Sequence, residues 1–215
     1  MITKRGFLAG AAAAAAAGAA PTSLGWGRGH ARPFDLVVFN ERYGDARAFA
    51  RALGSQGGAA FAIAGDAGTL WYRTLAQHVA AGARRVAGMS TPTDLFILET
   101  LAREAAGLRA RFVVHHDCRG GSTLTHSIYA DGRGRQVERA IRTAGAQWPV
   151  ALAAVLPYAA DPAARPQAAG LVVGLAADIR LATPVERAAD HPGLLVSWIL
   201  DGNRVADSQL KRDHQ

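Results

Sequence analysis

Cysteine is almost absent from this sequence, since Cys118 is the only one among 215 residues. A single cysteine cannot form an internal disulfide, so the fold must be stabilised by a hydrophobic core. Basic residues are common, but nearly all are arginines scattered along the chain, without a basic run or interleaved aromatic residues. Nucleic-acid binding is therefore not expected, although the formal net charge is +7.

Glycine-rich loops that bind phosphate are also missing. The chain reads NERYGDARAF at residues 40–49, after the first predicted strand, and has one glycine where a dinucleotide fingerprint has three. No glycine-rich loop followed by lysine occurs elsewhere in the sequence. These absences argue against a nucleotide cofactor, and the sequence leaves the identity of any other cofactor unknown.

The start of the chain has the composition of an export signal. Lys4 and Arg5 form a short basic head, a long alanine-rich core follows, and no acidic residue is present. Gly29 and Ala31 are the small residues that a signal peptidase needs, which predicts cleavage after Ala31. The core is too short and too weakly apolar to span a membrane well, so no stable membrane insertion is expected after cleavage.

The run TKRGFLAG, residues 3–10, resembles the twin-arginine export signal, with Lys4 in place of the first arginine. This resemblance implies export by the twin-arginine (Tat) machinery, which carries folded proteins. The substitution at Lys4 leaves the Sec machinery open as the other export partner. Either route predicts a periplasmic or secreted protein.

Removal of residues 1–31 leaves 184 residues (215 − 31) and lowers the formal charge to +4 (7 − 3), because Lys4, Arg5 and Arg28 are lost. This length suits a single domain with a sizeable core. We expect that domain to cover residues 32–202, and residues 203–215 to form a polar tail.

Apolar runs typical of strands alternate with segments of helical periodicity in the rest of the chain. The repeated strand–helix–strand order indicates a parallel sheet, and the continuous apolar runs are typical of strands covered on both faces. The predicted fold class is α/β: an open, mostly parallel, Rossmann-like sheet with helices on both faces and antiparallel β additions near the C-terminus. The predicted strands are 34–40, 59–66, 84–90, 109–117, an edge strand at 122–131, and an antiparallel pair at 170–176 and 194–202.

Ligands of open parallel sheets bind beyond the carboxyl ends of the strands. Polar residues follow several of the predicted strands, and they are the candidates for ligand binding: Asn40, Glu41, Arg42, Asp66 and Thr91. The alternative is that these residues only cap helices or form turns, because the starts of helices need polar side chains for that purpose.

A serine hydrolase is the most specific enzymatic hypothesis. The run GMSTP, residues 88–92, places Ser90 between a strand and a helix, as in a nucleophile elbow, although Pro92 stands where the elbow has its last glycine. His115, His116 or His126 could act as the base, and Asp66 or Asp117 could orient it. The catalytic set that we expect is Ser90, His116 and Asp117.

Metal binding is the second hypothesis for the run HHDC, residues 115–118. Adjacent residues of a strand point to opposite faces, so His115 and His116 cannot share an ion there. His115 and Asp117 are a better pair, and His126 or Asp66 could supply a third ligand. Zinc is the metal that such a set would hold.

The sequence contains no complete catalytic motif. We therefore expect a periplasmic ligand-binding or accessory protein that binds an unknown small molecule or a partner protein, such as an exported enzyme. The alternative is a small hydrolase that uses Ser90, or a metal held by His115 and Asp117. The sequence leaves open whether the protein is an enzyme.

Overall fold

The computed structural model describes residues 33–118, 123–129, 134–159, 179–184 and 193–202. They belong to one compact unit, Arg32–Gln215. The predicted export signal, the strand expected at 170–176 and the tail at 203–215 lie outside the described residues.

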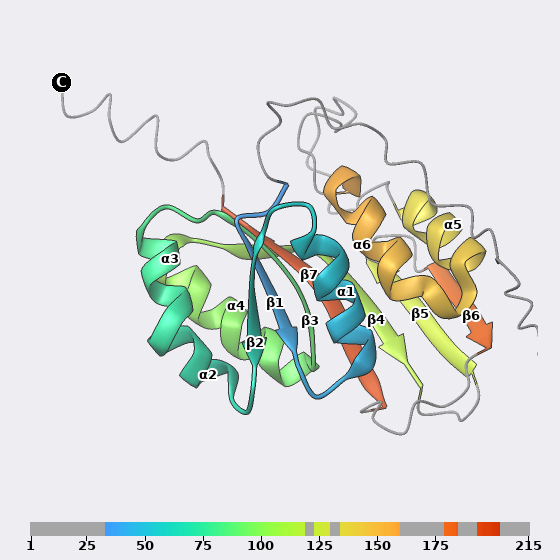
Figure 1. Ribbon diagram of the computed structural model, residues 1–215, viewed down its shortest axis with the longest axis horizontal. Helices are drawn as coiled ribbons and strands as arrows, with labels where there is room; N and C mark the ends of the chain where they lie inside the picture. Colours follow the sequence, from blue (N-terminus) through green and yellow to red (C-terminus); the bar gives the residue numbers. More distant parts are fainter. Residues whose placement is uncertain (1–32, 119–122, 130–133, 160–178, 185–192, 203–215) are drawn as a thin grey trace, which may run out of the picture. The chain divides into compact units, whose positions relative to one another are not determined.

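The described chain is an α/β structure (Figure 1). The strands are β1 Leu36–Asn40, β2 Ala59–Ile63, β3 Arg85–Ser90, β4 Arg109–Asp117, β5 Thr123–Tyr129, β6 Ile179–Pro184 and β7 Leu194–Asp201. The helical segments are α1 Gly44–Gly54, α2 Ala67–Leu70, η1 Trp71–Leu75, α3 Ala76–Ala80, α4 Pro92–Ala106, α5 Gly134–Ala144, η2 Gly145–Gln147 and α6 Trp148–Ala159.

These strands form one open, mixed sheet with the order β2-β1-β3-β7-β4-β5-β6. β1 is parallel to β2 and to β3, and the remaining neighbours are antiparallel. Because β3 and β4 both run antiparallel to β7, they point in the same direction. The carboxyl ends of β1, β2, β3 and β4 therefore lie at the same edge of the sheet, as expected from the sequence.

The expectation of a mostly parallel sheet is wrong for the pairings of β4 and β5. β7 lies between β3 and β4, and β5 lies between β4 and β6 rather than at an edge. The position of β7 has a physical reason, because Leu195–Leu200 are all buried and such a strand needs cover on both faces and both edges. The C-terminal strand β7 is antiparallel to its neighbours, as expected, but these neighbours are β3 and β4, and the predicted partner strand 170–176 lies outside the described residues.

Local signals position the helices as predicted. In α4, the Thr91 side chain accepts a hydrogen bond from the Asp94 backbone N–H, and the Asp94 side chain accepts one from the Thr91 N–H. This is a complete capping box, with Pro92 in the first turn. Gly107 ends the helix with φ +67°, a conformation that favours glycine.

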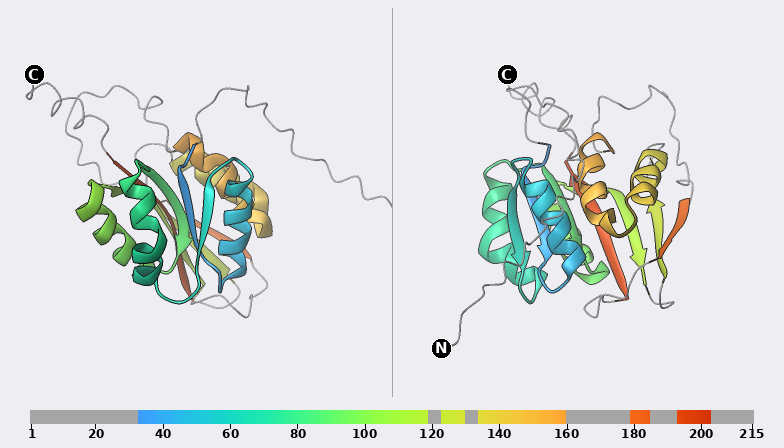
Figure 2. Two further views of the ribbon diagram at one scale, coloured as in Figure 1. Left: turned by 60° about the vertical axis from the view of Figure 1, so that its left-hand side comes forward. Right: turned by 45° about the vertical axis from the view of Figure 1, so that its right-hand side comes forward.

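Alternate strand residues contribute to two hydrophobic clusters. Val37 packs with residues of α1, α5 and α6 in the first cluster, whereas Leu36 and Val38 pack with residues of α2, η1, α3 and α4 in the second. Figure 2 shows the same grouping, with the green helices α2–α4 together and the blue and orange helices α1 and α6 together. Each strand thus has a first-cluster side and a second-cluster side, named after the cluster to which its side chains belong.

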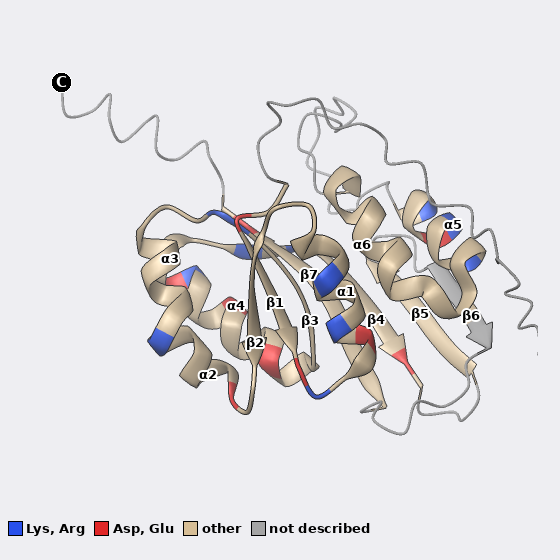
Figure 3. Ribbon diagram, in the orientation of Figure 1, with Lys and Arg blue, Asp and Glu red and all other residues tan. Residues whose placement is uncertain are grey.

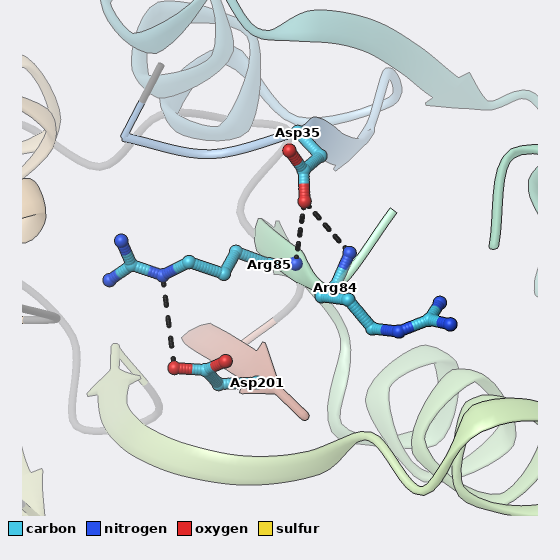
Figure 4. A network of polar contacts seen from close by, with 4 residues as sticks. All are labelled: Asp35, Arg84, Arg85 and Asp201. Atoms are coloured by element: carbon cyan, nitrogen blue, oxygen red, sulfur yellow. Dashed lines mark hydrogen bonds and ion pairs between the residues drawn. The ribbon is translucent and has the colours of Figure 1, made fainter. Parts of the chain in front are cut away.

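Charged residues join the ends of three strands opposite the carboxyl edge (Figure 4). Asp35 Oδ2 accepts hydrogen bonds from the backbone N–H groups of Arg84 and Arg85, at 2.8 and 2.9 Å. Arg85 Nε lies 3.7 Å from Asp201 Oδ2, and its guanidinium lies over the ring of Phe34. These contacts link the starts of β1 and β3 to the end of β7.

Candidate functional site

The carboxyl edge of the sheet is occupied by side chains that bind one another. Asn40 Nδ2 at the end of β1 donates to Asp94 Oδ2 at 3.0 Å, and Asp94 is the residue that completes the capping box with Thr91. Asn40 and Asp94 are both buried. Asn40 thus links β1 to α4 through Asp94, and Thr91 caps α4, which agrees for Thr91 with the alternative that these residues serve as caps.

The other expected ligand-binding residues lie nearby on the surface. Glu41 and Arg42 are exposed, and the Arg42 N–H donates to Asn40 Oδ1 at 3.1 Å in a turn. Asp66 caps α2, because its Oδ2 accepts from the Thr69 N–H at 2.6 Å. This backbone hydrogen bond lowers the pKa of Asp66 by stabilising its charged form. The role that the structure assigns to Asp66 is capping.

Ser90 and His116 do not form the predicted catalytic pair. Ser90 is opposite Val196 in the register, on the second-cluster side, where its Oγ accepts from Trp198 Nε1 at 3.0 Å. His116 is opposite Leu195, on the first-cluster side. The period of two along the strands places these two side chains on opposite faces of the sheet, so they cannot act together.

The predicted metal ligands His115, Asp117 and His126 are not brought together either. β4 continues through Asp117, so His115 and Asp117 share one face, while His126 is paired with His116 on the other. The His115 ring lies against Tyr129, with centroids 5.0 Å apart. The described residues contain no group of three His, Cys, Asp or Glu side chains that could hold a metal ion.

The structure instead reveals a buried polar chain, which we name the Ser197–His116–His126 chain. His116 Nε2 lies 3.0 Å from Ser197 Oγ, and His116 Nδ1 lies 2.7 Å from His126 Nδ1. All three residues have 0% exposure. The Trp148 ring of α6 covers both imidazoles, with centroid distances of 4.3 Å to His116 and 4.9 Å to His126. A polar group sealed this well must be hydrogen-bonded for the fold to be stable.

The geometry of the chain restricts its protons. A contact between two Nδ1 atoms at 2.7 Å needs one N–H and one lone pair, so one ring donates and the other accepts. If His116 donates from Nδ1, its neutral Nε2 accepts from the Ser197 hydroxyl; if His126 donates, His116 Nε2 donates to Ser197 instead. In both arrangements the hydrogen bonds of His116 run in one direction along the chain.

Sequence reasoning missed Ser197 and the pairing of the two histidines. Ser197 stands in the run LLVSWILD, where a lone hydroxyl in an apolar strand was a signal that a partner was needed. The order serine, Nε2, Nδ1 and a third group resembles that of a nucleophile, a base and its orienting residue. Because every member is sealed from solvent, the arrangement can hold and pass a proton but offers no open surface to a substrate.

Another feature is on the exposed surface of α1, α5 and α6. α6 packs against both α1 and α5, and its residues include no charged side chain (Figure 3). Val150, Ala154 and Tyr158 are exposed on it at four-residue steps, so they form one stripe along the helix.

Arginines flank this stripe on both neighbouring helices. α1 exposes Arg47 and Arg51, and α5 exposes three more, whereas each of the two helices carries one acidic residue. The exposed arginines of α5 are Arg135, Arg139 and Arg142. We call this surface, made by the α6 stripe and the arginines of α1 and α5, the arginine-flanked face.

Comparison with protein-family models, with curated proteins and with solved structures gave no significant match in any of the three. The search for helices long and apolar enough to cross a membrane found none in the described parts of the chain.

Proposed function

We propose that this protein is an exported accessory protein that binds a partner protein through its arginine-flanked face. The partner segment has an apolar stripe for Val150, Ala154 and Tyr158, and acidic side chains on either side of that stripe. The observation that carries the proposal is the position of an uncharged, partly exposed helix between two helices that both expose arginines.

Charge complementarity favours an acidic partner. The three helices carry five arginines and two acidic residues, Asp45 and Glu138, which gives a net charge of +3 (5 − 2). Arginine binds carboxylates in a planar, two-pronged geometry, which suits glutamate or aspartate side chains of a partner helix. Opposite charges at the rim direct the approach of the partner, and the apolar stripe supplies the area that binding removes from water.

The proposal includes a Rossmann-like arrangement of the sheet, with helices on both of its faces. A Rossmann-like sheet with helices on both faces would present α1, α6 and α5 as one outer layer. The separation of the buried side chains into two clusters, one with α1, α5 and α6 and the other with α2, η1, α3 and α4, supports this arrangement.

Export remains a proposal that the first 31 residues support through their composition. N-terminal sequencing of the protein recovered from a periplasmic fraction tests it, with Arg32 expected as the first residue. Replacing Lys4 and Arg5 together by glutamine is expected to retain the full-length precursor inside the cell. Recovery of the unprocessed chain from the periplasm would contradict cleavage after Ala31.

The binding test uses a synthetic helical peptide with leucines along one face and glutamates beside them, labelled for fluorescence anisotropy. We expect a dissociation constant of about 10 μM or below in low salt, and weaker binding as salt screens the charges. The same peptide with lysines in place of the glutamates serves as the control ligand and should not bind.

Matched variants locate the interaction. Ala154→Glu places a carboxylate on the stripe and is expected to abolish binding, whereas Ala105→Glu, at an exposed alanine of α4, should leave it unchanged. Arg139→Gln should weaken binding more than Arg103→Gln on α4. Equal effects of the paired variants, or binding only to vesicles of anionic phospholipid, would overturn the proposal of a protein partner.

A further inference from the structure

We infer that the Ser197–His116–His126 chain is an acid-sensitive latch that holds α6 on the sheet. Its two histidines come from neighbouring strands, β4 and β5, and its serine from β7, so one hydrogen-bonded chain spans three strands. Trp148, the first residue of α6, lies against both imidazoles. A change in the protonation of this chain therefore acts directly on the packing of α6.

The hydrogen bonds decide how many protons the latch accepts. With one added proton, His116 becomes a double donor, to His126 Nδ1 and to the oxygen of Ser197, so both contacts persist. A second added proton gives both rings an N–H at Nδ1, and two donors cannot remain 2.7 Å apart. The second proton thus breaks the His116–His126 contact and places two positive charges together.

The titratable residues of the described chain that share this face or its cluster include Cys118, Tyr43, Arg85 and Asp201. Cys118 and Tyr43 are buried in the first cluster, and Arg85 lies beside Asp201 at the end of the sheet opposite the carboxyl edge. β6 places Leu181 opposite His126 in the register. The first cluster on this side also contains the apolar residues Leu124, Val137, Ile141, Leu152, Leu156 and Leu195. The arginines of α5 lie on its exposed side.

The direction of the pH dependence follows from proton uptake. A histidine released to solvent takes up a proton at about pH 6.5, the pKa of an exposed histidine in a peptide. The closed state keeps its contacts with at most one added proton, whereas the opened state can take up two. The opened state therefore binds more protons, and the closed state loses stability as the pH falls below this value. Opening of α6 at acidic pH does not depend on the proposed function, whereas its consequence for the arginine-flanked face rests on it.

Hydrogen exchange of backbone amides tests the latch on the full mature protein. Between about pH 7.5 and about pH 4.5, after correction for intrinsic exchange, we expect opening of α6 to increase at least ~10-fold more than opening of α4. In His126→Gln this difference should fall to about threefold or less, because only one histidine remains to titrate. His78→Gln, at an exposed histidine of α3, is the matched control and should behave like the unaltered protein.

A second measurement keeps the inference testable if His126→Gln does not fold. Long-range ¹H–¹⁵N spectra of the imidazoles in the unaltered protein should show one protonated and one unprotonated Nδ1 in the pair at neutral pH. Two protonated Nδ1 atoms, or equal acceleration of exchange in α6 and α4, would overturn the latch. Acid opening without any binding of the glutamate peptide at neutral pH would contradict the proposed function alone.

Discussion

Ser197 Oγ and His116 Nε2 lie 3.0 Å apart although 81 residues separate them in the chain. Both are fully buried, and the contact joins β7 to β4 beneath Trp148 of α6. Removal of either partner would leave the other polar group buried without this hydrogen bond, and the lost hydration of that group would then destabilise the fold.

Ser197→Ala should therefore destabilise the protein by about 1–3 kcal/mol, the range for an orphaned buried group. Urea unfolding at neutral pH measures the change. Ser55→Ala is the control, because the exposed Ser55 hydroxyl donates to the Ala52 carbonyl at the surface and its loss should cost less than about 0.5 kcal/mol. Equal losses in the two variants would show that the buried contact contributes nothing.

Gly88 is required by the close approach of Trp198. A Cβ atom at Gly88 would lie 2.2 Å from the Trp198 ring, which is itself fully buried and cannot retreat. Gly88→Ala should cost about 3 kcal/mol or more through overpacking. Gly65→Ala has nothing within 4 Å of the added atom and should change thermal stability little. A Gly88→Ala protein with unchanged midpoint would contradict the close contact.

Removal of the two residues of the α4 capping box should lower the stability of the protein by different amounts. Thr91→Ala removes one cap and is expected to cost about 1 kcal/mol. Asp94→Ala should cost more, because the carboxylate also accepts the buried Asn40 amide. Thr93→Ala, at an exposed neighbour, is the control for both. The prediction fails if chemical denaturation ranks Thr91→Ala above Asp94→Ala.

The cap of α2 should make a small, pH-dependent contribution to the stability of the folded state. The Thr69 N–H holds the pKa of Asp66 below its ordinary value, so the folded state keeps the carboxylate charged to lower pH than the unfolded state does. This stabilisation is present above the unfolded pKa and is lost as the pH falls through the lowered folded pKa. Carboxyl ¹³C titration measures it directly, and Asp66→Asn should abolish the dependence. Titration of Asp66 at or above the ordinary value would contradict the cap.

Several elements could be predicted because their signals are local. The four buried residues of α1 recur on one helical face. Thr91, Pro92 and Asp94 are residue types typical of a helix N-terminus, and they predicted the start of α4. β4 was predicted with its exact bounds from one apolar run. The common carboxyl edge of β1 to β4 followed from the strand–helix order, and with it the position of Asn40 at that edge.

The candidate sites could not be predicted in the same way, because they depend on which strands become neighbours. Ser90 and His116 are both at strand ends in the sequence, yet the register of β7 assigns them to opposite faces. The same register brings Ser197 to His116, and the β4–β5 pairing brings His126 to it.

The sequence by itself determined the α/β character, the positions of most helices and strands, and the direction in which β1 to β4 run. Its periodicities and caps act between residues a few positions apart, so they can be recognised along the chain. Only the tertiary structure decided that β7 enters between β3 and β4, that the two histidines share a proton, and that α6 lies between two arginine-bearing helices. Those outcomes arise from competition among strands and helices for buried surface, and the local pattern of each element is compatible with more than one arrangement.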